Sequence, residues 1–267
     1  MSTRFFIVSL PFVLAACASA SSPAGGVVDA REAGPDAENS PDIDAGIQPD
    51  AGPGAADAAL ADAALAPDAA AVIGDALLIT EIVDATLSGG LPKFVELTNH
   101  SAASVDLSGF SLGVYSNGNT TLLNSVSTAL SGTIAAGDSF VLSFEASDSA
   151  GVGRFFDVYG VDPDDFGFSP SINGNDAIVL FLSDGGGGGG AATGDGTDAT
   201  IVDIYGVIGQ DGLGEAWEYT NGYASRKSTS VTASTTFAAG DWDFSGPEAL
   251  AGADGPAIAA ATSPGTR

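Results

Sequence analysis

The chain has few basic residues. Its 267 residues include only 7 Lys and Arg against 34 Asp and Glu, which gives a formal net charge of −27. Binding to a phosphate backbone requires Lys or Arg to displace counterions, and an acidic surface repels such a polymer. The composition therefore predicts no nucleic-acid partner and no direct adsorption of the folded part on anionic lipid.

Cysteine and histidine are equally scarce, because Cys17 and His100 are the single residues of their types. One cysteine excludes an internal disulfide, and a zinc site built from His and Cys is excluded in practice. A catalytic triad that depends on histidine would have to use His100. This residue lies in a polar turn, and the sequence shows no motif for an activated nucleophile near it. We therefore expect no enzymatic activity and interpret His100 as a turn residue.

The N-terminus carries an apolar run that is too short to span a bilayer comfortably. It covers residues 5–16 (FFIVSLPFVLAA), follows Arg4 and is interrupted by Pro11. Its end, Leu14–Cys17 (LAAC), resembles the lipobox of bacterial lipoproteins, in which the cysteine is lipidated and becomes the first residue of the mature chain. We predict a lipoprotein signal peptide at residues 1–16 and lipidation of Cys17. The alternative is an ordinary secretory signal with an incidental cysteine.

The predicted lipid sets the expected location of the protein. Membrane contact would be made through the lipid on Cys17, since several acyl chains anchor a protein stably. The next residue is Ala18 and not Asp, which by lipoprotein sorting rules favours the outer membrane in a cell with two membranes. We expect a bacterial cell-envelope protein, either an outer-membrane lipoprotein or a cell-surface protein.

Residues 17–75 are rich in Ala, Asp, Pro and Gly and contain few large apolar side chains. Pro-Asp-Ala recurs at Pro35, Pro49 and Pro67. Such a composition cannot bury enough apolar surface to offset the conformational entropy of the chain. Like charges and scattered prolines extend it. We predict a disordered tether that holds the following domain away from the membrane.

Residues 76–246 contain most of the branched and aromatic side chains and read as many short strands. Residues 77–84 place Ile79, Glu81 and Val83 on one face and Leu78, Thr80 and Ile82 on the other. Residues 93–99 place Val95 and Leu97 opposite Phe94, Glu96 and Thr98. Short strands, frequent turn signals and no long helical period predict an all-β sandwich. We expect a flexible Ala/Gly/Pro tail over residues 247–267.

Several segments of this domain resemble the lamin tail domain family. The similarity covers about residues 77–244 and is carried by 78–82 (LITEI), 94–99 (FVELTN), 105–112 (VDLSGFSL), 133–142 (TIAAGDSFVL), 172–180 (INGNDAIVL) and 201–206 (IVDIYG). The resemblance implies an immunoglobulin-like β-sandwich that acts as a binding or scaffold unit, with no catalytic residues to carry over. Residues 225–228 (SRKS) and 241–243 (DWD) resemble the subgroup found beside secreted bacterial nucleases. We expect the accessory module here without the nuclease domain.

Two carboxylates stand out in the predicted strands, Glu81 and Glu96. A carboxylate pair can perform acid–base chemistry, but the chain has few cations and the pair more simply has a structural role. We predict that Arg226 or Lys227 packs near Glu81 or Glu96 as a partly buried ion pair.

Aspartates also cluster in predicted loops. Asp162, Asp164 and Asp165 lie in one loop. A second group, Asp195 and Asp198, lies beside the glycine-rich run. Calcium prefers several oxygen ligands from flexible loops, so the first group is the better candidate for a calcium site. The alternative is solvated surface charge that keeps the protein soluble. No other cofactor is expected.

Three functions fit the sequence. The first is a lipid-anchored, non-catalytic surface domain that binds a protein, a glycan or matrix. The second is an accessory subunit of a separate secreted nuclease or other extracellular enzyme. The third is a purely structural envelope protein.

Overall fold

The computed structural model describes residues 77–145, 155–167, 172–183 and 190–266. The chain divides into one unit, Met1–Leu60, and a second, Ala61–Arg267, to which all described residues belong. The predicted signal peptide, Cys17 and the predicted tether lie outside the described residues.

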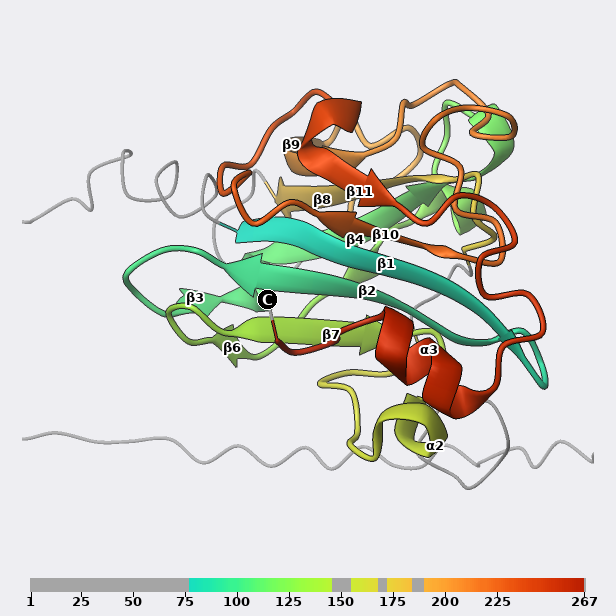
Figure 1. Ribbon diagram of the computed structural model, residues 1–267. Coiled ribbons are helices and arrows are strands. Elements are labelled where there is room, and N and C mark those ends of the chain that lie inside the picture. Colours follow the sequence, from blue (N-terminus) through green and yellow to red (C-terminus); the bar gives the residue numbers. More distant parts are fainter. Residues whose placement is uncertain (1–76, 146–154, 168–171, 184–189, 267) are drawn as a thin grey trace, which may run out of the picture. The chain divides into compact units, whose positions relative to one another are not determined.

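Two antiparallel sheets form a β-sandwich (Figure 1). The five-stranded sheet has the order β11-β10-β1-β2-β7, the four-stranded sheet has the order β5-β4-β8-β9, and β3 pairs with β6. The strands are β1 (Leu77–Leu87), β2 (Leu91–Asn99), β3 (Val105–Asp106), β4 (Phe110–Tyr115), β5 (Thr128–Ala129), β6 (Thr133–Ile134), β7 (Ser139–Ser143), β8 (Ala177–Ser183), β9 (Ala199–Tyr205), β10 (Tyr223–Arg226) and β11 (Trp242–Phe244). The α-helices are α2 (Phe155–Tyr159) and α3 (Gly255–Ala261), and the 3-10 helices are η1 (Leu107–Gly109), η2 (Ser116–Gly118), η3 (Leu123–Ser125) and η4 (Ala239–Asp241). The architecture confirms the predicted all-β, immunoglobulin-like sandwich.

The main core lies between the two sheets. Val95 and Leu97 of β2 pack there with Leu112 of β4 and Leu180 of β8, and all four side chains are fully buried. Phe94, the neighbour of Val95, belongs to a different apolar cluster on the outer face of the five-stranded sheet. The alternation predicted for β2 is therefore confirmed.

The alternation predicted for β1 is wrong at one point. Ile79 and Ile82 both lie in the main core, although strict alternation would place them on opposite faces. The register pairs Ile79 with Leu97 but Glu81 with Glu96, so Thr80 is the extra residue of a β-bulge. A bulge re-aims the side chains beside it. Because of this bulge, Thr80 and Glu81 both lie on the outer face of the sheet. There Thr80 contacts Glu96, and Glu81 contacts the C-terminal segment.

The outer face of the five-stranded sheet has an apolar end, which the two helices cover. Val83 and Phe94 of the sheet pack against Phe155 of α2 and against Leu250 and Ile258 of the C-terminal region. The Phe94 and Phe155 rings meet edge to face with centroids 5.4 Å apart. Figure 1 shows α2 and α3 together on the β7 side of this sheet. We call this region the helix-covered end.

The C-terminal region differs from the predicted flexible tail. Within residues 247–266, Leu250 and Ile258 are buried, and Ile258 is part of α3. The helix begins after Asp254, whose Oδ1 accepts a hydrogen bond from the Ala257 N–H at 3.0 Å, as an N-cap does. The alanine-rich composition suggested a segment without a core. Two large apolar side chains suffice here because the outer face of the sheet offers them an apolar surface to bury.

Candidate functional site

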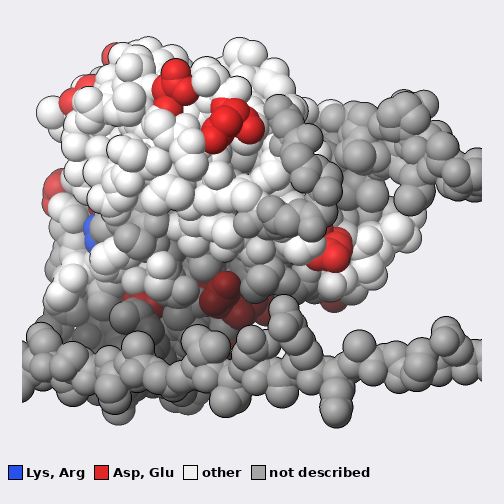
Figure 2. Space-filling view, turned by 180° about the vertical axis from the view of Figure 1, so that it is seen from behind, with Lys and Arg blue, Asp and Glu red and all other residues white. Residues whose placement is uncertain are grey.

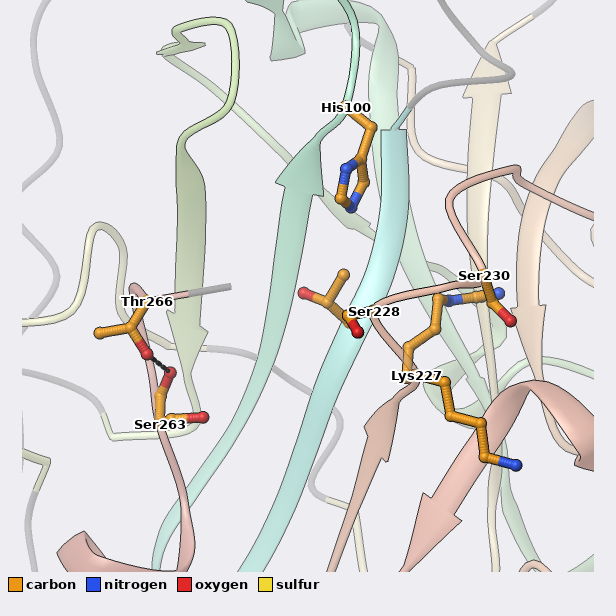
Figure 3. A pocket seen from close by; sticks show the side chains of 8 residues that line it. His100, Lys227, Ser228, Ser230, Ser263 and Thr266 are labelled. Carbon is orange, nitrogen blue, oxygen red and sulfur yellow. Dashed lines mark hydrogen bonds between the residues drawn. The ribbon is translucent and has the colours of Figure 1, made fainter.

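A pocket with a cavity volume of about 400 Å³ opens on the outer face of the five-stranded sheet, beyond the helix-covered end. Most of the residues that line it carry a hydroxyl group; the lining consists of Thr80, His100, Arg226, Lys227, Ser228, Ser230, Ser263 and Thr266. Figure 3 shows that the segment after β10 and the C-terminal segment form opposite walls above the first two strands. We call this region the pocket end of the face.

The floor of the pocket end is an ordered row of hydroxyl groups across three strands. Thr80 Oγ1 lies 2.7 Å from Glu96 Oε1 and 2.8 Å from Thr98 Oγ1, which lies 2.8 Å from Ser139 Oγ. Thr80 Oγ1 donates to Glu96, and a hydroxyl group has a single proton to donate. Thr98 therefore donates to Thr80, and Ser139 donates to Thr98. Hydrogen bonds aligned in this way polarise one another and strengthen the row.

Glu81 and Glu96 are fully buried and hold the C-terminal segment against the sheet. The Ser263 N–H donates to Glu81 Oε2 at 3.1 Å, and the Gly265 N–H donates to Glu96 Oε2 at 2.6 Å. Pro264, between them, has no N–H to satisfy. Glu81 Oε1 also accepts from Ser225 Oγ of β10 at 3.1 Å. One carboxylate thus links the two walls of the pocket.

Arg226 forms a buried ion pair, but with a carboxylate that the sequence did not suggest. Its Nη2 lies 2.5 Å from Asp203 Oδ2 of β9, and its Nε donates to the Ile79 carbonyl oxygen at 2.8 Å. Its Cζ lies 4.7 Å from the centroid of the Trp242 ring. The predicted burial of Arg226 is found, whereas the partner at this distance is Asp203 and not the predicted Glu81 or Glu96. A lone acid in the apolar strand 201–206 was the signal that sequence reasoning passed over.

Asp203 has more donors than Arg226 alone. Its Oδ2 accepts from the Ile79 N–H at 2.9 Å and its Oδ1 accepts from the Ser234 N–H at 3.0 Å. Burial raises the pKa of Asp203, and the Arg226 charge and these hydrogen bonds oppose that rise. With three charge-assisted contacts on one carboxylate, the ion pair ties the five-stranded sheet to β9 beneath the pocket.

His100 lines the pocket, although the sequence favoured a plain turn residue. Its pKa lies below the ordinary value of 6.5, first because of partial burial and second because of the positive charge of Arg226. Within the described part of the chain, no hydrogen bond joins the imidazole to Ser228, Ser230 or another pocket hydroxyl. A neutral imidazole both donates and accepts hydrogen bonds, so His100 adds one group of each kind to the pocket.

The three aspartates proposed for calcium do not converge. Among the described residues, no group of three or more His, Cys, Asp or Glu side chains is placed to hold a metal ion. Asp164 Oδ2 instead accepts from the Val141 N–H at 2.7 Å, and the Asp165 carbonyl oxygen accepts from the Ser143 N–H at 3.0 Å. These contacts cover the edge of β7, which would otherwise present unpaired backbone groups. Asp162 is exposed, as solvated surface charge would be.

No described helix combines the length and the apolar character that crossing a membrane requires. Cys17, the predicted lipidation site, lies outside the described residues, so its modification stays a prediction.

The comparison with protein families agrees with this architecture. The family model described as Lamin Tail Domain matches residues 73–206, about half of the 267-residue chain. The match spans β1 to β9, which includes the four-stranded sheet and the strands β1, β2 and β7 of the five-stranded sheet. A search of curated proteins finds no significant match. Fold and family match together show that the chain belongs to the lamin tail domain family.

Proposed function

We propose that this chain is a lipid-anchored, non-catalytic protein of the bacterial cell envelope that presents its lamin tail domain as a binding module. The pocket is the observation that carries the proposal. Thr80 and His100 on its floor lie within the residues matched by the family model, whereas the walls, at 226–230 and 263–266, lie beyond them. The pocket thus combines a floor from the family's sheet with walls from segments outside the family match. Such a site fits a binding module whose ligand is specific to this chain.

The chemistry of the pocket favours binding over catalysis. A general base must come within hydrogen-bond reach of the proton that it removes, and it is usually oriented by another group. Among the described residues, no group forms a hydrogen bond that would orient the His100 imidazole, and no hydroxyl group lies within hydrogen-bond reach of it as a nucleophile. The two buried carboxylates, Glu81 and Glu96, accept hydrogen bonds from backbone amides and hydroxyls of the pocket walls and floor. Their geometry supports a scaffolding role.

The predicted N-terminal segments supply the other part of the proposal. A lipid on Cys17 would anchor the protein, and a flexible segment of the length of residues 17–75 would span on the order of 40–50 Å. That reach would let the pocket meet ligands at some distance from the membrane surface. The acidic character of the chain would limit adhesion to anionic lipid.

Binding through the pocket can be tested with matched blocking variants of the full chain. Ser228 is an exposed pocket residue, and Ser88 is an exposed residue in the β1–β2 turn. We expect Ser228→Trp to abolish crosslinked capture of envelope components, and Ser88→Trp to leave it unchanged. Equal capture by wild type and both variants would show that the pocket is not the binding site.

Anchoring can be tested separately. We expect wild-type protein to incorporate labelled fatty acid and to fractionate with membranes, and Cys17→Ser to lose both properties. Label that persists in Cys17→Ser, or membrane association without label, would contradict the lipid anchor.

The accessory-subunit alternative has less support from the structure. The two motifs that resemble the nuclease-associated subgroup contact each other within the domain, where Arg226 of one motif packs on Trp242 of the other. They explain a shared fold rather than a shared activity. Nuclease activity that copurifies with the protein and survives high salt would favour the alternative.

A further inference from the structure

We propose that the pocket binds an uncharged saccharide. This inference rests on the proposed binding function and names the ligand class for the same site. It follows from the charges that line the pocket, from the hydrogen-bonding groups that remain, and from the size of the cavity.

The two described cations that line the pocket, Arg226 and Lys227, already contact other groups of the protein. Arg226 contacts Asp203, the Ile79 carbonyl oxygen and the Trp242 ring. Lys227 Nζ donates to the Gly240 carbonyl oxygen at 2.8 Å and lies 4.0 Å from Asp243, and Figure 3 shows its ammonium group turned away from His100. A phosphate or carboxylate ligand gains most from cations that can form charge-assisted hydrogen bonds with it. The committed cations therefore disfavour an anionic ligand.

The carboxylates of the floor are equally unsuited to a cationic ligand. Glu81 and Glu96 are fully buried beneath the hydroxyl row and the C-terminal segment, and each accepts hydrogen bonds from these groups. A cation in the pocket would meet the positive charge of Arg226, which already lowers the pKa of His100. On the opposite face, Figure 2 shows dispersed acidic side chains, with blue of a basic side chain visible only at the edge.

What remains for a ligand is a set of groups that both donate and accept. In the described residues, Ser228 Oγ and the imidazole of His100 form no hydrogen bond within the protein. Thr266 Oγ1 donates to the Ser263 carbonyl oxygen at 2.9 Å and keeps its acceptor capacity. Hydroxyl groups and a neutral imidazole match the hydroxyl groups of a sugar, which also donate and accept.

The size of the pocket is compatible with such a ligand. A volume of about 400 Å³ falls within the range of small-ligand pockets, about 300–1,000 Å³. Its openness to solvent would allow a sugar at the end of a longer glycan to enter. A peptide strand would instead need an accessible sheet edge, and the nearby edge of β7 is covered by Asp164 and Asp165.

The single histidine gives a direct readout. Because His100 is the only histidine in the chain, its imidazole proton resonance reports on the pocket without assignment of other signals. The probes are three sugars of similar shape: glucose, which is neutral, glucuronate, which is anionic, and glucosamine, which is cationic. We expect glucose to shift the His100 resonance of the full-length protein saturably, with a Kd in the millimolar range, and both charged sugars to bind more weakly.

Serine variants connect the shift to the pocket. Ser228→Ala should weaken glucose binding about two- to tenfold, as expected for one lost hydrogen bond, whereas Ser88→Ala should not change it. The saccharide assignment is overturned if glucose leaves the resonance unmoved, if glucuronate binds more tightly, or if Ser228→Ala binds like wild type. Envelope capture that is still lost in Ser228→Trp would then leave the binding module in place with a different ligand class.

Discussion

The two ends of the outer sheet face are built from the same strands but are covered by different chemistry. At the helix-covered end, Val83 and Phe94 bury apolar surface against α2 and α3. At the pocket end, two residues away on each strand, Glu81 and Glu96 accept hydrogen bonds from backbone amides of the C-terminal segment. One end is held by non-directional burial and the other by directed hydrogen bonds and charge. The C-terminal region is therefore docked on the sheet by both mechanisms, and a polar pocket stays open beside it at the pocket end.

The largest expected effect lies at the pocket end. Arg226→Ala should lower the free energy of unfolding by about 3–5 kcal/mol, because it leaves Asp203 buried without its cation. Chemical denaturation measures this change. The double variant Arg226→Met, Asp203→Leu should recover a large part of the loss, since it removes both charges. An unchanged midpoint for Arg226→Ala would show that the pair does not secure this end.

At the helix-covered end, Ile258→Ala should cost about 2–5 kcal/mol through lost burial and the cavity left behind. Ala260→Ser, an exposed change on the same helix, is the control and should stay within about 0.5 kcal/mol of wild type. The same denaturation experiment applies. If Ile258→Ala behaves like its control, α3 does not contribute to the stability of the outer face.

A smaller effect is expected from the hydroxyl row. Thr80→Val keeps the shape of the side chain but removes the donor to Glu96, which should cost about 1–3 kcal/mol. Thr229→Val changes an exposed threonine near the pocket and should have little effect on the melting temperature. Equal stability of the two variants would mean that the row is not a structural part of the pocket floor.

The smallest effect concerns His100. Its pKa in the folded protein should be below 6.5, because burial and the charge of Arg226 disfavour the imidazolium. A lowered pKa means that the unfolded state binds more protons below about pH 6.5, so this group slightly destabilises the fold as the pH falls through that region. NMR titration of the single imidazole measures the pKa directly. A value at or above 6.5 would contradict the described surroundings of His100.

The local patterns that the sequence carries account for most of the strands. Alternation in β2 places Val95 and Leu97 in the core, and the predicted all-β sandwich of short strands is the fold observed. The same reasoning failed in β1, because a bulge at Thr80 depends on how two strands pair and leaves no mark in the alternation itself. It also failed at residues 247–266, whose composition is that of a flexible tail. Leu250 and Ile258 order this segment only because a complementary apolar surface exists elsewhere in the fold.

The sequence by itself determined the fold class, the family resemblance and the candidate carboxylates, because these follow from periodicity and from residue types at short range. It also indicated that Arg226 or Lys227 would form a partly buried ion pair with an acid. Only the tertiary structure decided which acid, since Asp203 lies on a strand of the opposite sheet. The pocket likewise has no sequence signature, because Thr80, Ser228 and Ser263 are far apart in the chain. They meet because the bulge turns Thr80 outward and two buried glutamates draw the C-terminal segment across the sheet.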